Sequence, residues 1–222
     1  MGASIVWLAT LSACSLYFGP QGGGADPGLD TGAAQPTIPK RMFVTSTRYP
    51  GGSLGGLVGA DAKCNERAAV AGMTGEFSAW LSDASTSAGS RMTHSSGVYT
   101  LVDGTLVAQS WQSLVSGELE RAIDRDETNQ PYDSTVPYDH PNWNYTLNPK
   151  PVWTGTMYDG RDYAQRSYCL QYTDGPDCAC YGWNSTEGRA MAGDALSVTV
   201  NWSEGEGVMS CVTEAALYCV EQ

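Results

Sequence analysis

Three carboxylates that stand close together in the sequence have the chemistry to bind a metal ion. Asp124, Asp126 and Glu127 lie in one short run, and Asp133 and Asp139 follow downstream. Carboxylate oxygens are the hard ligands that calcium prefers, and alternate residues converge when a loop wraps around an ion. The spacing is not that of an EF-hand, and the whole chain is acidic. A calcium site and an ordinary solvated loop therefore both remain open.

Aromatic residues with polar groups are concentrated in the same part of the chain. Two asparagines, at positions 142 and 144, accompany four such rings: Tyr132, Tyr138, Trp143 and Tyr145. Exposed rings of this kind stack on sugar rings or anchor a protein partner. We therefore predict ligand binding here. The alternative is that the rings pack the loop back onto the domain.

Cys14 has the sequence context of a lipid anchor. The apolar stretch before it ends in the run Leu-Ser-Ala-Cys at 11–14, where small residues give a signal peptidase access to the backbone. The pattern predicts a bacterial lipoprotein signal peptide over 1–14, although the positive residues that usually open such a peptide are missing. Cys14 would then carry the lipid and begin the mature chain. The alternative is an apolar segment with an incidental cysteine.

The remaining cysteines are predicted to form disulfides. Removing Cys14 from the seven leaves six, an even number that suits an oxidising compartment. Cys178 and Cys180 stand two positions apart, which favours a small local disulfide over metal or redox chemistry. The sequence alone does not fix the pairing of the six, which are Cys64, Cys169, Cys178, Cys180, Cys211 and Cys219.

Composition limits the classes of function. The net charge is −12 and there is no basic run, which disfavours electrostatic binding to nucleic acid or to an anionic membrane surface. The chain has only two histidines, and neither lies in a recognisable motif with a serine or cysteine nucleophile, so we predict that it is not an enzyme. Seven tryptophans and twelve tyrosines outnumber three phenylalanines, which is typical of half-wet binding faces.

The chain divides into a signal peptide, a tether and one domain. Residues 15–40 are rich in glycine and proline and predict a flexible tether. Residues 41–222 are enough for one domain with its own core. Within it, residues 118–150 have no periodic pattern and predict a long surface excursion, where function tends to lie.

Periodicity within the domain predicts two helices and several short strands, and therefore an α+β fold. We expect a helix over 61–72 capped by Asp61, with Cys64 and Ala68 on one face, and a short second helix capped by Ser110. Alternating apolar residues predict strands over 42–46, 77–81, 152–154, 167–170, 196–200 and 216–220.

Six motifs carry a resemblance to a known family. They are Gly-Ala-Asp-Ala-Lys-Cys at 59–64, Ala-Gly-Met-Thr-Gly-Glu-Phe-Ser-Ala-Trp-Leu-Ser at 71–82, Ser-Trp-Gln-Ser-Leu at 110–114, Val-Trp-Thr-Gly at 152–155, Tyr-Cys at 168–169, and the cysteine-bearing tail at 211–221. In this order they resemble the endostatin domain of collagens, a variant of the C-type lectin-like fold, over residues 41–222. A bacterial chain with this pattern is similar to the endostatin-like domains of spirochaete surface lipoproteins. The resemblance implies two nested disulfides, Cys64 with Cys219 around Cys169 with Cys211.

The sequence departs from the endostatin pattern in three places. Endostatin binds zinc through histidines near its N-terminus, whereas residues 38–50 here contain none. Its basic heparin-binding patches have no counterpart in this acidic chain. Residues 174–187 form an insertion beyond the pattern, and we take this insertion as the second candidate for ligand binding after the 124–145 loop.

Together these observations predict a lipid-anchored protein of the bacterial cell envelope, at the outer membrane or cell surface. We expect its domain to be a non-enzymatic binding module for extracellular protein or glycan ligands, without a nucleic-acid partner. Calcium is the one cofactor under consideration. The first alternative is a structural component of the envelope or of an appendage. The second is a hydrolase of surface polysaccharide that uses carboxylates such as Asp124 and Glu127.

Overall fold

Short strands, one long helix and several short helices make up the part of the chain that the computed structural model describes, residues 38–132, 150–163, 177–205 and 207–222. Contacts group Gln35–Gln222 into one compact unit, a mixed α/β arrangement with a mostly sheet core. Its strands are β1 (Lys40–Val44), β2 (Tyr49–Pro50), β3 (Phe77–Ala79), β4 (Tyr99–Leu101), β5 (Leu106–Ala108), β6 (Pro151–Trp153), β7 (Arg189–Asp194), β8 (Val208–Ser210) and β9 (Glu214–Glu221). Its helices are α1 (Gly56–Val70), α2 (Ala88–Arg91), α3 (Trp111–Leu114) and α5 (Cys180–Trp183), with 3-10 turns η1 (Gly51–Ser53) and η2 (Val200–Trp202).

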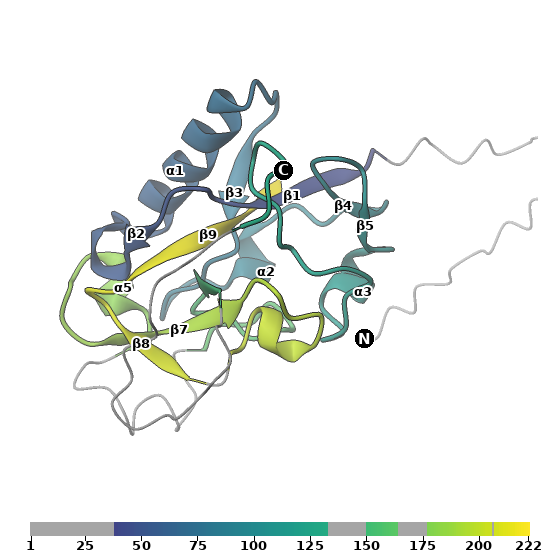
Figure 1. Cartoon of the computed structure of the whole chain (residues 1–222). Helices are drawn as coiled ribbons and strands as arrows, with labels where there is room; N and C mark the ends of the chain where they lie inside the picture. The colour runs from purple at the N-terminus through teal and green to yellow at the C-terminus, as the bar shows by residue number, and fades with distance from the viewer. Residues whose placement is uncertain (1–37, 133–149, 164–176, 206) are drawn as a thin grey trace, which may run out of the picture. The chain divides into compact units, whose positions relative to one another are not determined.

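The last strand, β9, lies at the centre of the sheet. The strand order is β5-β4-β1-β9-β6-β7-β8, and β2 and β3 also pair with β9. β1, β2 and β3 run antiparallel to β9, and β6 runs parallel to it. Figure 1 shows β9 passing through the domain between α1 and the strands β7 and β8. The strand predicted over 216–220 is confirmed and holds the fold together.

Alternate residues of β9 enter two different hydrophobic cores. All of its residues from Ala215 to Val220 are buried, because side chains of a strand point to opposite faces and both faces are covered. The tyrosine-side core takes the even-numbered residues and includes Ala216, Tyr218, Val220, Met42, Val44, Trp80, Tyr132 and Trp202. The cysteine-side core takes the odd-numbered residues and includes Ala215, Leu217, Cys219, Phe43, Cys64, Phe77, Trp153, Trp183 and Cys211.

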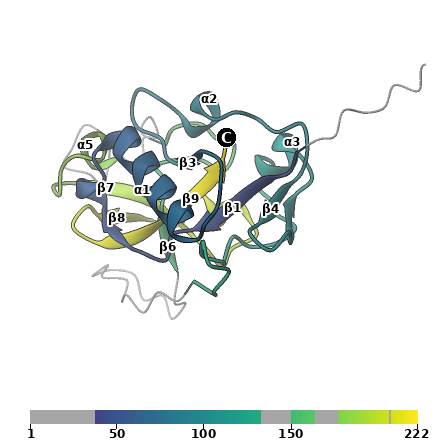
Figure 2. The same ribbon diagram turned by 90° about the horizontal axis from the view of Figure 1, so that it is seen from above.

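α1 covers the cysteine-side core. Its buried residues are Ala60, Cys64 and Ala68, which are spaced by four and therefore share one helix face. Seen from above, α1 lies along β9 (Figure 2). The disulfide from Cys64 to Cys219, with Cα atoms 5.5 Å apart, joins the helix to the last strand. This pair was predicted and is confirmed.

α1 begins earlier than its predicted start at Asp61. The residue before the helix is Gly55, whose φ of 82° is left-handed, and no side chain caps the first turn. Asp61 instead accepts the backbone N–H of Ala79 at 2.8 Å. One turn later, Asn65 bonds both the N–H and the C=O of Phe77. The carboxylate that suggested a cap therefore covers the edge of β3, a tertiary role that local sequence does not reveal.

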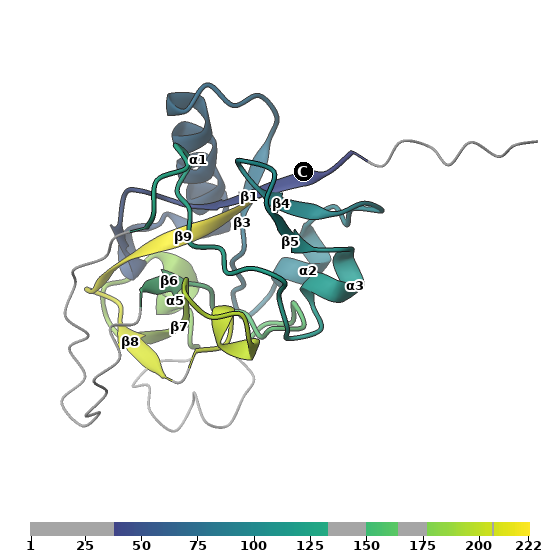
Figure 3. The ribbon, with the colours of Figure 1, turned by 45° about the vertical axis from the view of Figure 1, so that its right-hand side comes forward.

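The second predicted helix cap is confirmed. Ser110 accepts the backbone N–H of Ser113 at 3.2 Å at the start of α3, which lies beside β4 and β5 (Figure 3). Strands were also predicted over 42–46, 77–81 and 152–154, and β1, β3 and β6 confirm them. The strand predicted over 167–170 falls outside the described residues.

The strand predicted over 196–200 is wrong. β7 ends at Asp194 and the chain turns before η2 begins at Val200. The apolar residues that alternate here do not face a core, because Leu196 is 48% exposed and Val198 is 42% exposed. Alternation alone therefore indicated a strand where the structure has a surface turn.

The inner disulfide joins Cys180 to Cys211, with Cα atoms 5.6 Å apart. The predicted partner of Cys211 was Cys169, which lies outside the described residues. That pair is wrong because Cys211 bonds Cys180, although the observed disulfide is still nested inside the one from Cys64 to Cys219. Cys178 and Cys180 do not bond each other either. Cys178 is disulfide-bonded and packs in a small separate cluster, whereas Cys180 enters the cysteine-side core. The backbone turns between them, with Cys180 at a left-handed φ of 48°, and the two side chains lie in different clusters.

Candidate functional site

Glu127, one of the three predicted calcium ligands, is committed to an ion pair. Its side chain is fully buried and lies 2.5 Å from a guanidinium nitrogen of Arg67. It also accepts the backbone N–H of Ser46 at 2.9 Å. Partial burial alone would lower the pKa of the Arg67 guanidinium, but the hydrogen bond and charge of Glu127 outweigh it and raise that pKa. The pair fastens the segment after residue 124 to α1.

The other two carboxylates face different partners. One oxygen of Asp126 accepts the N–H groups of Thr128 and Gln130 at 2.8 and 2.9 Å, which closes a local turn. Asp124 lies 3.5 Å from Arg121 and 3.7 Å from Arg125. No group of three or more His, Cys, Asp or Glu side chains within the described ranges could hold a metal ion. As arranged here, the three carboxylates do not fit a calcium ion, which needs six to eight converging oxygens.

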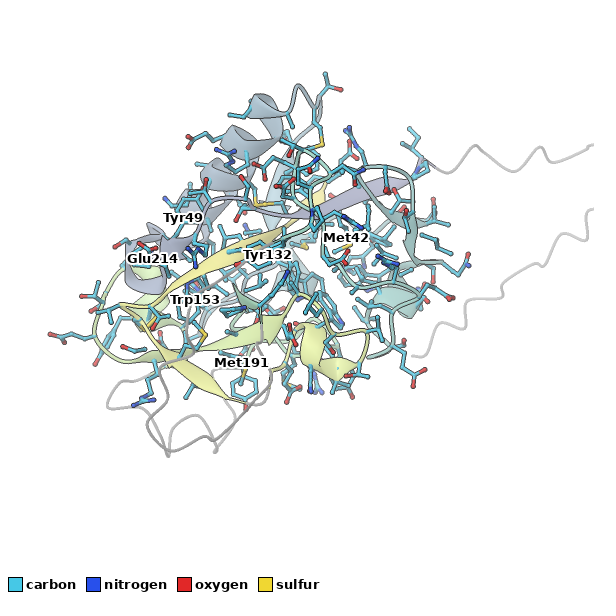
Figure 4. The ribbon with its side chains drawn as sticks, viewed as in Figure 1. Met42, Tyr49, Tyr132, Trp153, Met191 and Glu214 are labelled. Atoms are coloured by element: carbon cyan, nitrogen blue, oxygen red, sulfur yellow. A yellow bond between two sulfur atoms is a disulfide. The ribbon has the colours of Figure 1, made fainter. Side chains whose placement is uncertain are left out.

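Tyr132 does not provide an exposed ring. It is 3% exposed, lies in the tyrosine-side core (Figure 4), and its hydroxyl donates to the carbonyl of Pro151 at 3.3 Å. The expectation of an open aromatic face is wrong for this residue. The other three predicted rings, Tyr138, Trp143 and Tyr145, lie outside the described residues, as does the predicted lipidation site Cys14.

The segment from Cys180 to Trp183 has the most unusual backbone of the described chain. Four consecutive residues are left-handed, with φ of 48° at Cys180, 54° at Tyr181, 66° at Gly182 and 66° at Trp183. For a residue other than glycine, this conformation costs about 1–2 kcal/mol. Strain of this kind persists only where the surroundings impose it, and it is concentrated at functional sites. This segment lies in the 174–187 insertion, so we take it as the candidate site and call it the left-handed turn.

A single buried carboxylate holds the left-handed turn from inside. Asp177 is 8% exposed. One of its oxygens accepts the N–H groups of Ala179 and Tyr181 at 3.2 and 2.9 Å, and the other accepts the N–H of Gly182 at 3.1 Å. A charged acceptor makes stronger hydrogen bonds than a neutral one. Asp177 therefore supplies part of the free energy that keeps the backbone in this conformation.

Trp183 anchors the far end of the left-handed turn. Its ring is fully buried, and its indole N–H donates to the carbonyl of Ser82 at 2.8 Å. The ring meets that of Trp153 edge-on, with centroids 5.8 Å apart. Gly155 leaves room for the Trp183 ring beside the Ser82 carbonyl, because a Cβ there would lie 2.7 Å from each of them.

Buried hydroxyl groups stiffen the layer beneath this anchor. Ser82 and Thr156 share a hydrogen bond of 2.8 Å between their hydroxyls. Thr154 donates to the carbonyl of Ser203 at 2.7 Å, and the hydroxyl of Ser203 accepts the indole N–H of Trp80 at 2.7 Å. All four hydroxyl residues are buried. A buried polar network with every member satisfied fixes one arrangement of its segments.

The left-handed turn presents apolar and amide groups to solvent around a rigid disulfide. Tyr181 follows Cys180 and is 39% exposed, and Val212 follows Cys211 and is 61% exposed. The disulfide therefore holds two exposed apolar side chains next to its two ends. Asn184 is exposed, and its amide nitrogen donates to the carbonyl of Gly182 at 2.8 Å. The carboxylate, glycine and asparagine in 177–184 signal a turn, but no local pattern predicts left-handed cysteine, tyrosine and tryptophan.

Two comparisons of the sequence with known proteins find no relative of the chain. No protein-family model matches the chain, and no curated protein matches it. Within the described residues, no helix is long and apolar enough to cross a membrane.

Proposed function

We propose that residues 41–222 are a non-enzymatic binding module, an endostatin-like variant of the C-type lectin-like fold, held at the bacterial cell surface by a lipid on Cys14. Three structural features support this assignment of the fold. The first strand pairs antiparallel with the last, and Cys64 joins the first helix to that last strand. A second disulfide is nested inside the first. The six sequence motifs lead to the same family.

The left-handed turn is the observation that supports ligand binding. A protein keeps four left-handed residues in a row only when surrounding contacts impose them, and here Asp177, a disulfide and the Trp183 anchor all do so. The outcome is an exposed tyrosine at a fixed position. Tyrosine supplies a large contact area with little loss of conformational entropy, which makes it common in binding faces.

The chemistry of the left-handed turn favours an uncharged contact surface. Tyr181 offers a ring and a hydroxyl, Val212 an aliphatic group and Asn184 an amide. Rings and amides bind the faces and hydroxyls of sugars, and rings with aliphatic neighbours anchor proteins. We therefore expect an extracellular glycan or protein as the ligand.

A hydrolase is a weaker proposal because of Glu127. A catalytic carboxylate has to reach its substrate, but the Glu127 side chain has no exposed surface and is bound by Arg67. The alternative is a structural role in the envelope. The binding experiment distinguishes that role from ligand binding.

The experiment is an array of glycans and extracellular-matrix proteins probed with the chain and two variants. Tyr181→Ala should weaken binding at least about tenfold while the melting temperature stays within a few degrees, since an exposed residue contributes little to stability. Tyr158→Ala, at a half-buried tyrosine outside the turn, is the matched control and should bind normally. If Tyr181→Ala also binds normally, the site lies elsewhere; if the wild-type chain binds nothing, the envelope role is favoured.

The anchor needs a test of its own. A Cys14→Ala chain should be released from the membrane fraction of the cells that produce it. Retention at the wild-type level would show that another anchor operates.

A further inference from the structure

Four buried polar atoms have no hydrogen-bond partner within the described part of the chain. Besides the Oδ1 oxygen of Asp162, three of them belong to segments that meet beside β9. They are the indole nitrogen of Trp202, the hydroxyl of Tyr218 and the Oδ1 oxygen of Asp124. Trp202 and Tyr218 are both fully buried. Unpaired buried polar atoms destabilise a fold and are few in native proteins, so a cluster of them calls for an explanation.

The three atoms belong to segments that meet on one side of β9. The rings of Trp202 and Tyr218 pack together in the tyrosine-side core, with centroids 5.6 Å apart. Val44 pairs with Tyr218 across the sheet and donates its N–H to the carbonyl of Arg125 at 2.9 Å, so that Asp124, the residue before Arg125, lies near this part of β9. Burial raises the pKa of the Tyr218 phenol, and the negative charges of Asp194 and Asp124 raise it further.

The three groups do not hydrogen-bond one another in the structure. An indole N–H only donates a hydrogen bond, an ionised carboxylate only accepts, and a phenol does either. A ligand that suits all three must accept from Trp202 and donate to Asp124. A cation fails because the indole N–H points its positive end at the site, and an anion fails because of the carboxylate.

We propose that one internal water molecule is bound between Trp202, Tyr218 and Asp124. Water accepts two hydrogen bonds and donates two, so it can accept from the indole, donate to the carboxylate and use the phenol in either sense. Buried waters make about three hydrogen bonds to groups that otherwise lack partners. The three atoms supply that number.

This water links three separate parts of the chain. Trp202 ends η2, Tyr218 lies on β9, and Asp124 lies in the segment that leads to Tyr132. The direct ion pairs of Asp124 are long, 3.5 Å to Arg121 and 3.7 Å to Arg125. The water therefore holds Asp124 against the central strand.

Stability measurements on the full-length chain test the site with Tyr218→Phe. If the phenol bonds to the water, its loss breaks a hydrogen bond, and the unfolding equilibrium constant should rise by about five- to tenfold with a lower melting temperature. If the phenol has no partner, removing it relieves an unpaired group and the melting temperature rises. A rise would overturn the proposal. Tyr99→Phe is the matched control, because its buried hydroxyl accepts the N–H of Ser95 directly at 2.8 Å and its loss must destabilise.

Nuclear magnetic resonance supplies the second measurement. The indole proton of Trp202 should show a cross-peak to a long-lived water and exchange slowly with solvent, since its ring is fully buried. An indole proton whose cross-peaks all come from protein protons would overturn the proposal, whatever Tyr218→Phe does to stability.

Discussion

The carboxylate of Asp177 accepts the backbone N–H of Tyr181 at 2.9 Å, four residues along the chain. This contact joins a buried charge to the most exposed ring of the left-handed turn. It explains how a tyrosine adopts a φ of 54°, because the free energy of the hydrogen bonds to Asp177 offsets the strain of the backbone. The position of the ring is thus set by a residue that no ligand would touch.

Replacing Asp177 should therefore affect both stability and binding. Asp177→Ala removes the acceptor of three N–H groups, and we expect a loss of about 2–4 kcal/mol in the free energy of unfolding. Ligand binding should fall although Tyr181 is still present. Asp103→Ala is the control, because Asp103 is exposed and its carboxylate accepts the N–H of Thr105 at the surface; about 0.5 kcal/mol is expected there. Equal losses in a urea titration of the two variants would contradict the role of Asp177.

Gly155 offers a test of the anchor beneath the turn. Its φ is 53°, and an added Cβ would lie 2.7 Å from both the Trp183 ring and the Ser82 carbonyl. Gly155→Ala should cost about 3 kcal/mol or more, from backbone strain together with the clash. Gly104 separates the two effects, since its φ is 86° but nothing lies within 4 Å of an added Cβ. Gly104→Ala should cost only about 1 kcal/mol, and an equal cost at both glycines would mean that Trp183 moves aside freely.

Local patterns in the sequence predicted the elements that local physics decides. The spacing of Cys64 and Ala68 marks a helix face, and Ser110 is a cap whose bond partner lies three residues away. The apolar run at 216–220 is a strand buried on both faces. In each case the signal and the structure it specifies lie within a few residues of each other.

The features that the sequence did not predict depend on contacts between residues far apart in the chain. Asp61 looked like a cap but bonds to Ala79, eighteen residues away. The partner of Cys211 depends on how the segment around Cys180 folds back onto β7 and β8. The left-handed turn is imposed by Asp177, a disulfide and a buried ring together, so its residues carry no sign of it one by one. The candidate site was for the same reason only a second choice from sequence.

Glu127 and Arg67 should be strongly coupled. Glu127→Ala leaves the guanidinium of Arg67 without its partner, and the loss of one member of a buried pair costs about 3–5 kcal/mol. Arg67 is 19% exposed on its side chain, so water moderates the cost and the low end applies. Glu120→Ala, at an exposed neighbour, should be nearly neutral. A double variant Arg67→Ala with Glu127→Ala should lose less than the sum of the two single variants; a strictly additive loss would show that the pair is not formed.

The ion pair of Glu127 with Arg67 also predicts how the chain responds to the removal of calcium. With Glu127 bound by Arg67 and Ser46, we expect a chelator to leave the melting temperature unchanged. A drop of several degrees on chelation, restored by added calcium, would show that Asp124, Asp126 and Glu127 rearrange around an ion.

The pairing of Glu221 with Arg41 gives the fold a dependence on pH. Burial raises the pKa of Glu221, but the hydrogen bonds and charge of Arg41 outweigh this and bring the pKa below its ordinary value of 4.5. The guanidinium contacts the carboxylate at 2.8 and 2.5 Å. A carboxyl group with a lowered folded-state pKa stabilises the fold above its unfolded pKa, and this contribution is lost as pH falls through the folded value.

Glu221→Gln should therefore destabilise the chain by about 1 kcal/mol at pH 7, a modest value because both side chains are partly exposed. The difference from the wild type should shrink as pH falls below about 4.5 and disappear once Glu221 is protonated in the folded state. Glu214→Gln is the control, since Glu214 is exposed at the other end of β9 (Figure 4) and forms no ion pair among those of the described residues. Chemical denaturation of the three chains from pH 3 to pH 7 measures the effect. A Glu221→Gln deficit that stays constant over this range would mean that the lost contact is not the charged pair with Arg41.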